Sequence, residues 1–135
     1  MNWAVYLHPL AMLGIVGLGL WVFREGLRLR RARMGQRAAD RRAHTRIARP
    51  LVVLIALGYA SGLASMIWLR REVPMASVHF WLASGAALGL VGAGALGLWL
   101  ERRVSADVRA LHLAAGSIGL LLALGAALAA FAILP

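Results

Sequence analysis

The sequence predicts an all-α protein, a transmembrane four-helix bundle. Of its 135 residues, 61% are hydrophobic, and the mean hydropathy is +0.76. A soluble domain of this length needs more charged and polar surface. The apolar residues fall into four blocks, each about 20 residues long, which is the length that a helix needs to cross a bilayer. Arginine-bearing segments separate these blocks, so we expect a single domain over residues 1–135.

Each block is predicted to be one span. The four spans cover about residues 3–23, 44–69, 78–100 and 111–134, and an arginine-rich connection covers residues 24–43. Trp3 and Trp21 lie near the two ends of the first block, where interfacial aromatic residues are common. No basic segment precedes this block, so we interpret it as a retained span and not as a signal peptide.

The positions of the basic residues predict the membrane topology. All 15 are arginines, and the formal charge is +10. Ten lie between residues 24 and 49, three lie in the third connection, and two lie in the second. Because basic residues are retained on the cytoplasmic side, the first and third connections are predicted inside and both termini on the outer side. Topology and contact with anionic membrane lipid therefore explain the charge, and we expect no nucleic-acid partner.

Four histidines are the candidate metal ligands, since the chain has no cysteine for a thiolate site or an iron–sulfur cluster. Each stands near the start of one span: His8, His44, His79 and His112. An imidazole inside a membrane is costly unless it has a function or a partner. Spans one and three run in the same direction, so His8 and His79 are expected near the outer face, and His44 and His112 near the cytoplasmic face.

Each of these two pairs comes from alternate helices. Alternate helices of a four-helix bundle lie diagonally across its core, where two imidazoles can ligate one haem iron from opposite sides. The sequence therefore predicts two bis-histidine haem b groups, with the four histidines as cofactor-binding and metal-ligating residues.

Small and basic residues accompany the histidines. One turn after the histidine, three spans carry a small residue that leaves room for a porphyrin: Ala48, Ala83 and Gly116. Gly119 is expected to extend this cleared face, whereas the first span carries Met12. Arginines near each face are candidate partners of the haem propionates, namely Arg41, Arg42, Arg46 and Arg109 inside, and Arg70 and Arg71 outside.

The stretch His8-Pro9-x-x-Met12 resembles the HPxxM signature of the cytochrome b561 superfamily. His79-Phe80-Trp81, and Leu111-His112 with Gly116, are similar to its later histidine helices. The resemblance covers essentially the whole chain and implies two b haems, with His8–His79 and His44–His112 as axial pairs. The chain matches only the four-helix core, as in short bacterial members, so ascorbate is not expected as donor. The resemblance implies a multi-pass protein of the bacterial cytoplasmic membrane.

These observations predict an electron-transfer cytochrome that acts as a subunit of a larger membrane redox complex. Its donor or acceptor would be a quinone, another small molecule or a partner subunit. Two alternatives remain open at this stage. One is a haem-free structural or assembly subunit, and the other is a small four-helix transporter. No Asp or Glu lies within the predicted spans, which disfavours a proton-coupled transporter.

Overall fold

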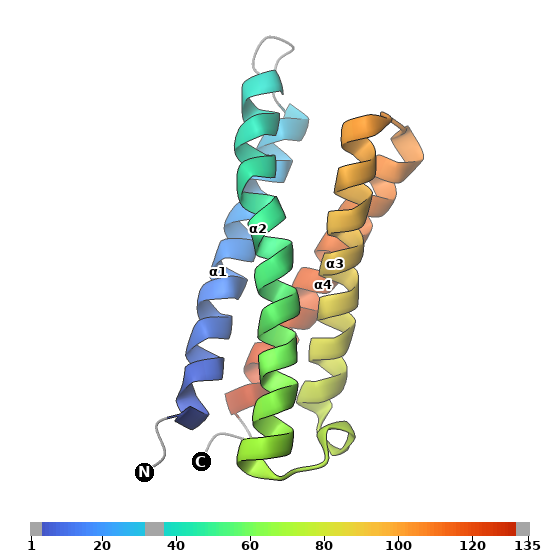
Figure 1. The fold of residues 1–135 in the computed structure, drawn as a ribbon. Helices are drawn as coiled ribbons and strands as arrows, with labels where there is room; N and C mark the ends of the chain where they lie inside the picture. Colours follow the sequence, from blue (N-terminus) through green and yellow to red (C-terminus); the bar gives the residue numbers. More distant parts are fainter. Residues whose placement is uncertain (1–3, 32–36, 132–135) are drawn as a thin grey trace.

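The computed structural model describes residues 4–31 and 37–131, and within them the regular secondary structure is all helical, joined by short turns (Figure 1). Trp3 and the end of the fourth predicted span lie outside these residues. The predicted all-α four-helix architecture is confirmed. Its elements are α1 (Ala4–Arg31), α2 (Arg37–Ala64), η1 (Ser65–Arg70), η2 (Pro74–Ala76), α3 (Val78–Arg102) and α4 (Ala106–Phe131).

The helices extend beyond the predicted spans. Most of residues 24–43, expected to form a connection, is helical, because α1 continues to Arg31 and α2 begins at Arg37. Likewise, α4 begins at Ala106, five residues before its predicted span. Arginine and alanine are good helix formers, so the helices continue after the apolar residues end. Pro50 lies inside α2, as a proline can within a membrane helix whose neighbours help to satisfy the backbone.

The four helices form a bundle in which sequential helices are neighbours. Contacts join α1 to α2, α2 to α3, α3 to α4 and α4 to α1, and the closest association is between α3 and α4 (Figure 1). The diagonal pairs are therefore α1 with α3 and α2 with α4. This arrangement places His8 diagonally opposite His79 and His44 diagonally opposite His112, on the helices that the sequence assigned to each pair.

The outer surface of the bundle is apolar. Val22, Leu51 and Ile55 form a small buried cluster, whereas many large hydrophobic side chains on all four helices are exposed, among them Leu10, Trp21, Leu57, Leu88, Trp99 and Leu121. All four helices are long and apolar enough to cross a membrane. The chain therefore has the structure of a multi-pass membrane protein, with the exposed side chains as its lipid-facing surface.

Glycines allow α3 and α4 to pack closely. A Cβ atom added to Gly119 would lie 2.9 Å from the backbone nitrogen of Leu90, and one added to Gly89 would lie 2.9 Å from Cα of Gly119. Such close approach of two backbones is typical of small residues in membrane helices. The expectation that Gly119 clears a face for a porphyrin is wrong, because α3 fills that space.

The turn between α2 and α3 positions His79. η1 is a π-helical end of α2, and Arg71 follows it in the left-handed conformation, with φ 55°. Ser77 then caps α3, since its side chain accepts a hydrogen bond of 3.1 Å from the backbone nitrogen of Phe80. His79 therefore lies in the first turn of α3, at the same end of the bundle as the start of α1 (Figure 1).

Candidate functional site

The imidazoles of His44 and His112 face each other at one end of the bundle. Their ring centroids are 6.5 Å apart, and the ring planes are inclined by 84°. His44 extends from α2 and His112 from α4, so the pair joins diagonally opposite helices. Both rings are half-buried.

A cavity of about 1550 Å³ contains this pair. Its volume exceeds the roughly 300–1,000 Å³ of ordinary small-molecule pockets. All four helices contribute to its wall, and Gly116 is part of it, as is Ala48, one turn from His44. The remaining wall is largely apolar, with Val22, Leu51, Ile55, Leu90, Ala93 and Leu120. His44 and His112 therefore lie in a space large enough for a sizeable, largely apolar ligand.

Arginines surround the polar end of this cavity. Those that line it are Arg30, Arg41, Arg42, Arg49 and Arg109. Of the predicted propionate partners at this end, Arg41, Arg42 and Arg109 lie in the wall, whereas Arg46 is exposed and does not line the cavity. Arg49 forms an ion pair with Glu101, which joins α2 to α3 at this end. An anionic group that projects from a ligand in the cavity would meet several guanidinium groups.

The second histidine pair lies toward the other end. His8 is within electrostatic range of both His79 and Arg70. Of the two arginines predicted near this pair, Arg71 is exposed and lines neither pocket. Of these two arginines, Arg70 is therefore the one that interacts with His8.

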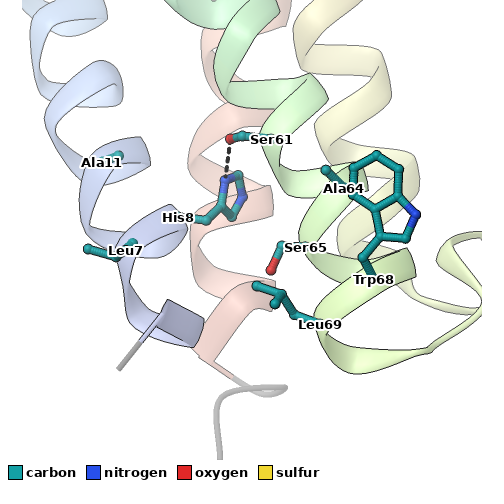
Figure 2. A pocket seen from close by; sticks show the side chains of 8 residues that line it. All are labelled: Leu7, His8, Ala11, Ser61, Ala64, Ser65, Trp68 and Leu69. Carbon is teal, nitrogen blue, oxygen red and sulfur yellow. Dashed lines mark hydrogen bonds between the residues drawn. The ribbon is translucent and has the colours of Figure 1, made fainter. Parts of the chain in front are cut away.

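A smaller pocket of about 520 Å³ opens beside His8, between α1 and the end of α2. Figure 2 shows the imidazole of His8 reaching from α1 toward Ser61 on α2. The pocket is lined by Leu7, His8, Ala11, Ser61, Ala64, Ser65, Trp68 and Leu69. Its wall combines apolar side chains with one imidazole and two hydroxyls, a composition typical of sites for small amphipathic molecules.

Hydrogen bonds orient two of the imidazoles. Nδ1 of His79 lies 2.9 Å from the carbonyl oxygen of Ala126, and Nδ1 of His112 lies 2.8 Å from that of Ala93. A carbonyl oxygen only accepts, so Nδ1 carries the hydrogen in both rings. The other nitrogen, Nε2, then keeps a free lone pair. Histidines that ligate metals usually have this arrangement, in which the second ring nitrogen donates to a carbonyl or carboxylate.

The other two histidines have different surroundings. Nδ1 of His8 lies 3.3 Å from Oγ of Ser61. Among the described residues, Nδ1 of His44 is buried without a hydrogen-bond partner, and the backbone of Val22 is the polar group beside it. A buried polar atom without a partner is uncommon and often belongs to a binding site.

The described residues contain no group of three or more His, Cys, Asp or Glu side chains that could hold a metal ion. The histidines occur instead as pairs. A bare metal ion would therefore lack a full set of side-chain ligands here, whereas a haem iron takes only its axial ligands from the protein. The donor set thus fits a haem better than a free ion.

Sequence reasoning identified the histidines but missed several of their neighbours. Ser61 and Arg30 were not singled out, and Arg49 was expected near His44 but given no role, although Ser61 bonds to His8 and both arginines line the large cavity. Nothing local in the sequence marks these residues. The signal that could have led to Ser61 is its place one turn after Gly58, which stands fourteen residues after His44 on the same helix.

Comparisons with protein-family models, with curated proteins and with solved structures found no match to this chain. The function of this chain is therefore inferred from its sequence, its fold and the surroundings of its four histidines.

Proposed function

We propose that this protein is a b-type cytochrome that holds two haem b groups, one near each membrane face, and carries electrons across the bilayer. The observation that supports this most is the His44–His112 pair inside a cavity of about 1550 Å³. With ring centroids 6.5 Å apart on diagonally opposite helices, these two imidazoles would be the residues that hold a haem iron between them.

The remaining residues take roles according to their positions. His44 and His112 would hold the inner haem, and His8 and His79 the outer one. Arg109 and its neighbours in the cavity wall would bind the inner propionates, and Gly116 belongs to the wall beside His112. When bound, haem iron supplies a site that gains and loses single electrons. The chain's part is to orient the imidazoles and to exclude water from the apolar cavity.

The electron donor and acceptor would come from outside the chain. The described residues form helices and short turns without a further domain. We therefore propose a quinone, another small molecule or a partner subunit of a membrane redox complex as the exchanging group. The pocket beside His8 offers a small amphipathic molecule access near the outer pair. The HPxxM resemblance supports placing the protein with the short bacterial members of the cytochrome b561 superfamily, in the cytoplasmic membrane.

Absorption spectra of the detergent-purified protein, oxidised and dithionite-reduced, with a pyridine haemochrome count per chain, test this function. We expect two haem b per chain, and the loss of one in His8→Ala and of one in His44→Ala. Ala43→Ser is the matched control for His44→Ala, since Ala43 is the adjacent residue, is exposed and does not line the cavity. This variant should keep both haems.

A colourless protein from cells supplied with haem would contradict the proposal. The structural-subunit interpretation would then lead, with the close contact of α3 and α4 as its main feature. Binding of a transported substrate by a haem-free chain would favour the transporter instead.

A further inference from the structure

The hydrogen bonds of the histidines follow a regular spacing along the helices. His79 on α3 bonds to Ala126 on α4, and His112 on α4 bonds to Ala93 on α3. Ala93 is fourteen residues after His79, and Ala126 is fourteen residues after His112. Fourteen residues are nearly four helical turns, or about 21 Å, so both positions lie on the same face of their helix. In this antiparallel pair, each histidine therefore meets the carbonyl that lies fourteen residues beyond the other.

The same spacing occurs in the pair formed by α1 and α2. Fourteen residues after His8 stands Val22, whose backbone lies beside the ring of His44. Fourteen residues after His44 stands Gly58, the position that corresponds to the acceptor for His8. The two antiparallel pairs thus place their histidines and acceptors in the same register.

At His8, the hydroxyl group of Ser61 lies between the imidazole and the carbonyl oxygen of Gly58. Ser61 donates a hydrogen bond of 2.8 Å from Oγ to the carbonyl oxygen of Gly58. The same Oγ lies 3.3 Å from Nδ1 of His8 (Figure 2). A serine hydroxyl has one hydrogen to donate, and here the Gly58 carbonyl receives it. Toward His8 the oxygen of Ser61 is therefore an acceptor, so Nδ1 must carry the hydrogen.

We propose that Ser61 is a positioning residue that holds His8 in the tautomer with hydrogen on Nδ1 and a free lone pair on Nε2. This tautomer is the one that the backbone carbonyls impose on His79 and His112. Ser61 thereby links His8 to the carbonyl of Gly58, which is the acceptor expected from the fourteen-residue spacing. The role of this tautomer in haem ligation rests on the proposed function, whereas the tautomer itself does not.

The neighbouring hydroxyl of Ser65 provides a matched control. Ser65 is one turn farther along and lines the same pocket as Ser61, but it makes no hydrogen bond to His8 (Figure 2). A serine that only adds polarity to the pocket would act from either position. A serine that sets the His8 tautomer acts only from position 61.

The first measurement is a redox titration of the purified full-length chain and of its Ser61→Ala, Ser61→Thr and Ser65→Ala variants. A hydrogen bond from Nδ1 makes Nε2 a more basic ligand, which stabilises oxidised iron. In Ser61→Ala we expect one of the two reduction steps to move to higher potential while the other stays. The outer haem should be retained about 10–100-fold less tightly, which is the usual effect of losing such a partner.

Ser61→Thr keeps the hydroxyl and should restore both values, and Ser65→Ala should match the unaltered chain. Unchanged potentials and unchanged haem retention in Ser61→Ala would overturn the proposal. Equal shifts in Ser61→Ala and Ser65→Ala would overturn it as well, since they would show a general effect of pocket polarity.

A second readout keeps this inference separate from the proposed function. If the purified chain carries no haem, the proposed function fails, and ¹⁵N NMR of ring-labelled histidine still reports the tautomer of His8. We then expect a protonated Nδ1 in the unaltered chain and in Ser61→Thr, and a shift toward protonated Nε2 in Ser61→Ala. A His8 signal that Ser61→Ala leaves unchanged would overturn the inference.

Discussion

At the scale of single residues, the site depends on what lies directly against each imidazole. A Cβ atom added to Gly62 would lie 2.7 Å from Cε1 of His8, closer than real Cβ contacts. A Cβ atom at Gly97 would lie 3.3 Å from Cε1 of His112. Because glycine has no side chain, each imidazole can lie directly against the backbone of the neighbouring helix. This contact sets the direction in which each ring points.

We therefore predict that Gly62→Ala displaces the ring of His8. The added methyl group has no space, and overpacking of this kind typically destabilises by about 1–3 kcal/mol. Under the proposed function, the haem count per chain should fall from two toward one, and the haem proposed between His44 and His112 should be kept. Gly14→Ala is the control, because a Cβ atom at Gly14 meets nothing within 4 Å. Equal haem content in both variants would show that Gly62 does not position His8.

The residues that orient the imidazoles could not be predicted from local sequence. His79 and His112 bond to the carbonyls of Ala126 and Ala93. Every alanine has a carbonyl, and which carbonyl an imidazole reaches depends on the register in which α3 packs against α4. For the same reason sequence reasoning chose Arg46, although Arg49, one turn away, lines the cavity and pairs with Glu101.

At the scale of helices, the bundle consists of two antiparallel pairs, α1 with α2 and α3 with α4, and the helices of the second pair pack more closely. α3 and α4 make the most extensive contact, through backbones that approach at Gly89 and Gly119. Membrane helices associate largely through van der Waals contact and not through the hydrophobic effect, since lipid is as apolar as their side chains. Close packing at these glycines therefore stabilises the α3–α4 pair and fixes the register that His79 and His112 need.

This view predicts a difference between two glycine variants. Gly119→Ala would place a methyl group 2.9 Å from the backbone of Leu90 and separate the two helices. We expect a loss of about 1–3 kcal/mol in the free energy of unfolding, as for other overpacked sites. Gly92→Ala should be neutral or slightly stabilising, because a Cβ atom there meets nothing within 4 Å.

Thermal or denaturant unfolding in detergent, followed by circular dichroism, measures both glycine variants. Equal stability of Gly119→Ala and Gly92→Ala would refute the idea that the close approach holds α3 and α4 together. A loss confined to Gly119→Ala would support it.

At the scale of the whole molecule, the inner cavity lies where the two helix pairs meet. Side chains from all four helices line it, and the His44–His112 pair spans it between diagonal helices. Arginines gather at the same end, which the arginine counts predict to be cytoplasmic. The histidine pair and the arginines of the cavity therefore lie at one end of the bundle, the end that is predicted to be cytoplasmic.

The topology can be tested by cysteine labelling, since the chain has no cysteine of its own. Ala76 lies in the turn between α2 and α3, and Val104 lies between α3 and α4, and both are exposed. We expect Ala76→Cys to react with a membrane-impermeant maleimide in intact cells. Val104→Cys should react only after the membrane is opened. The reverse pattern would invert the predicted orientation.

The sequence by itself determined the fold class. Hydropathy and length are properties of each segment alone, and a helix is the local structure that satisfies its own backbone in lipid. The histidines were equally visible, because a polar ring in an apolar block stands out wherever it occurs. Hydropathy did not locate the helix ends, since it reports where lipid ends and not where the backbone stops being helical.

Only the tertiary structure decided which atoms meet. The close pairing of His44 with His112, the bond from His8 to Ser61 and the filling of the Gly119 face by α3 all depend on how one helix is placed against another. That placement results from packing between segments distant in the chain, so no single segment encodes it. The spacing of fourteen residues was present in the sequence throughout, but it gained meaning only when the antiparallel register showed which carbonyl each imidazole reaches.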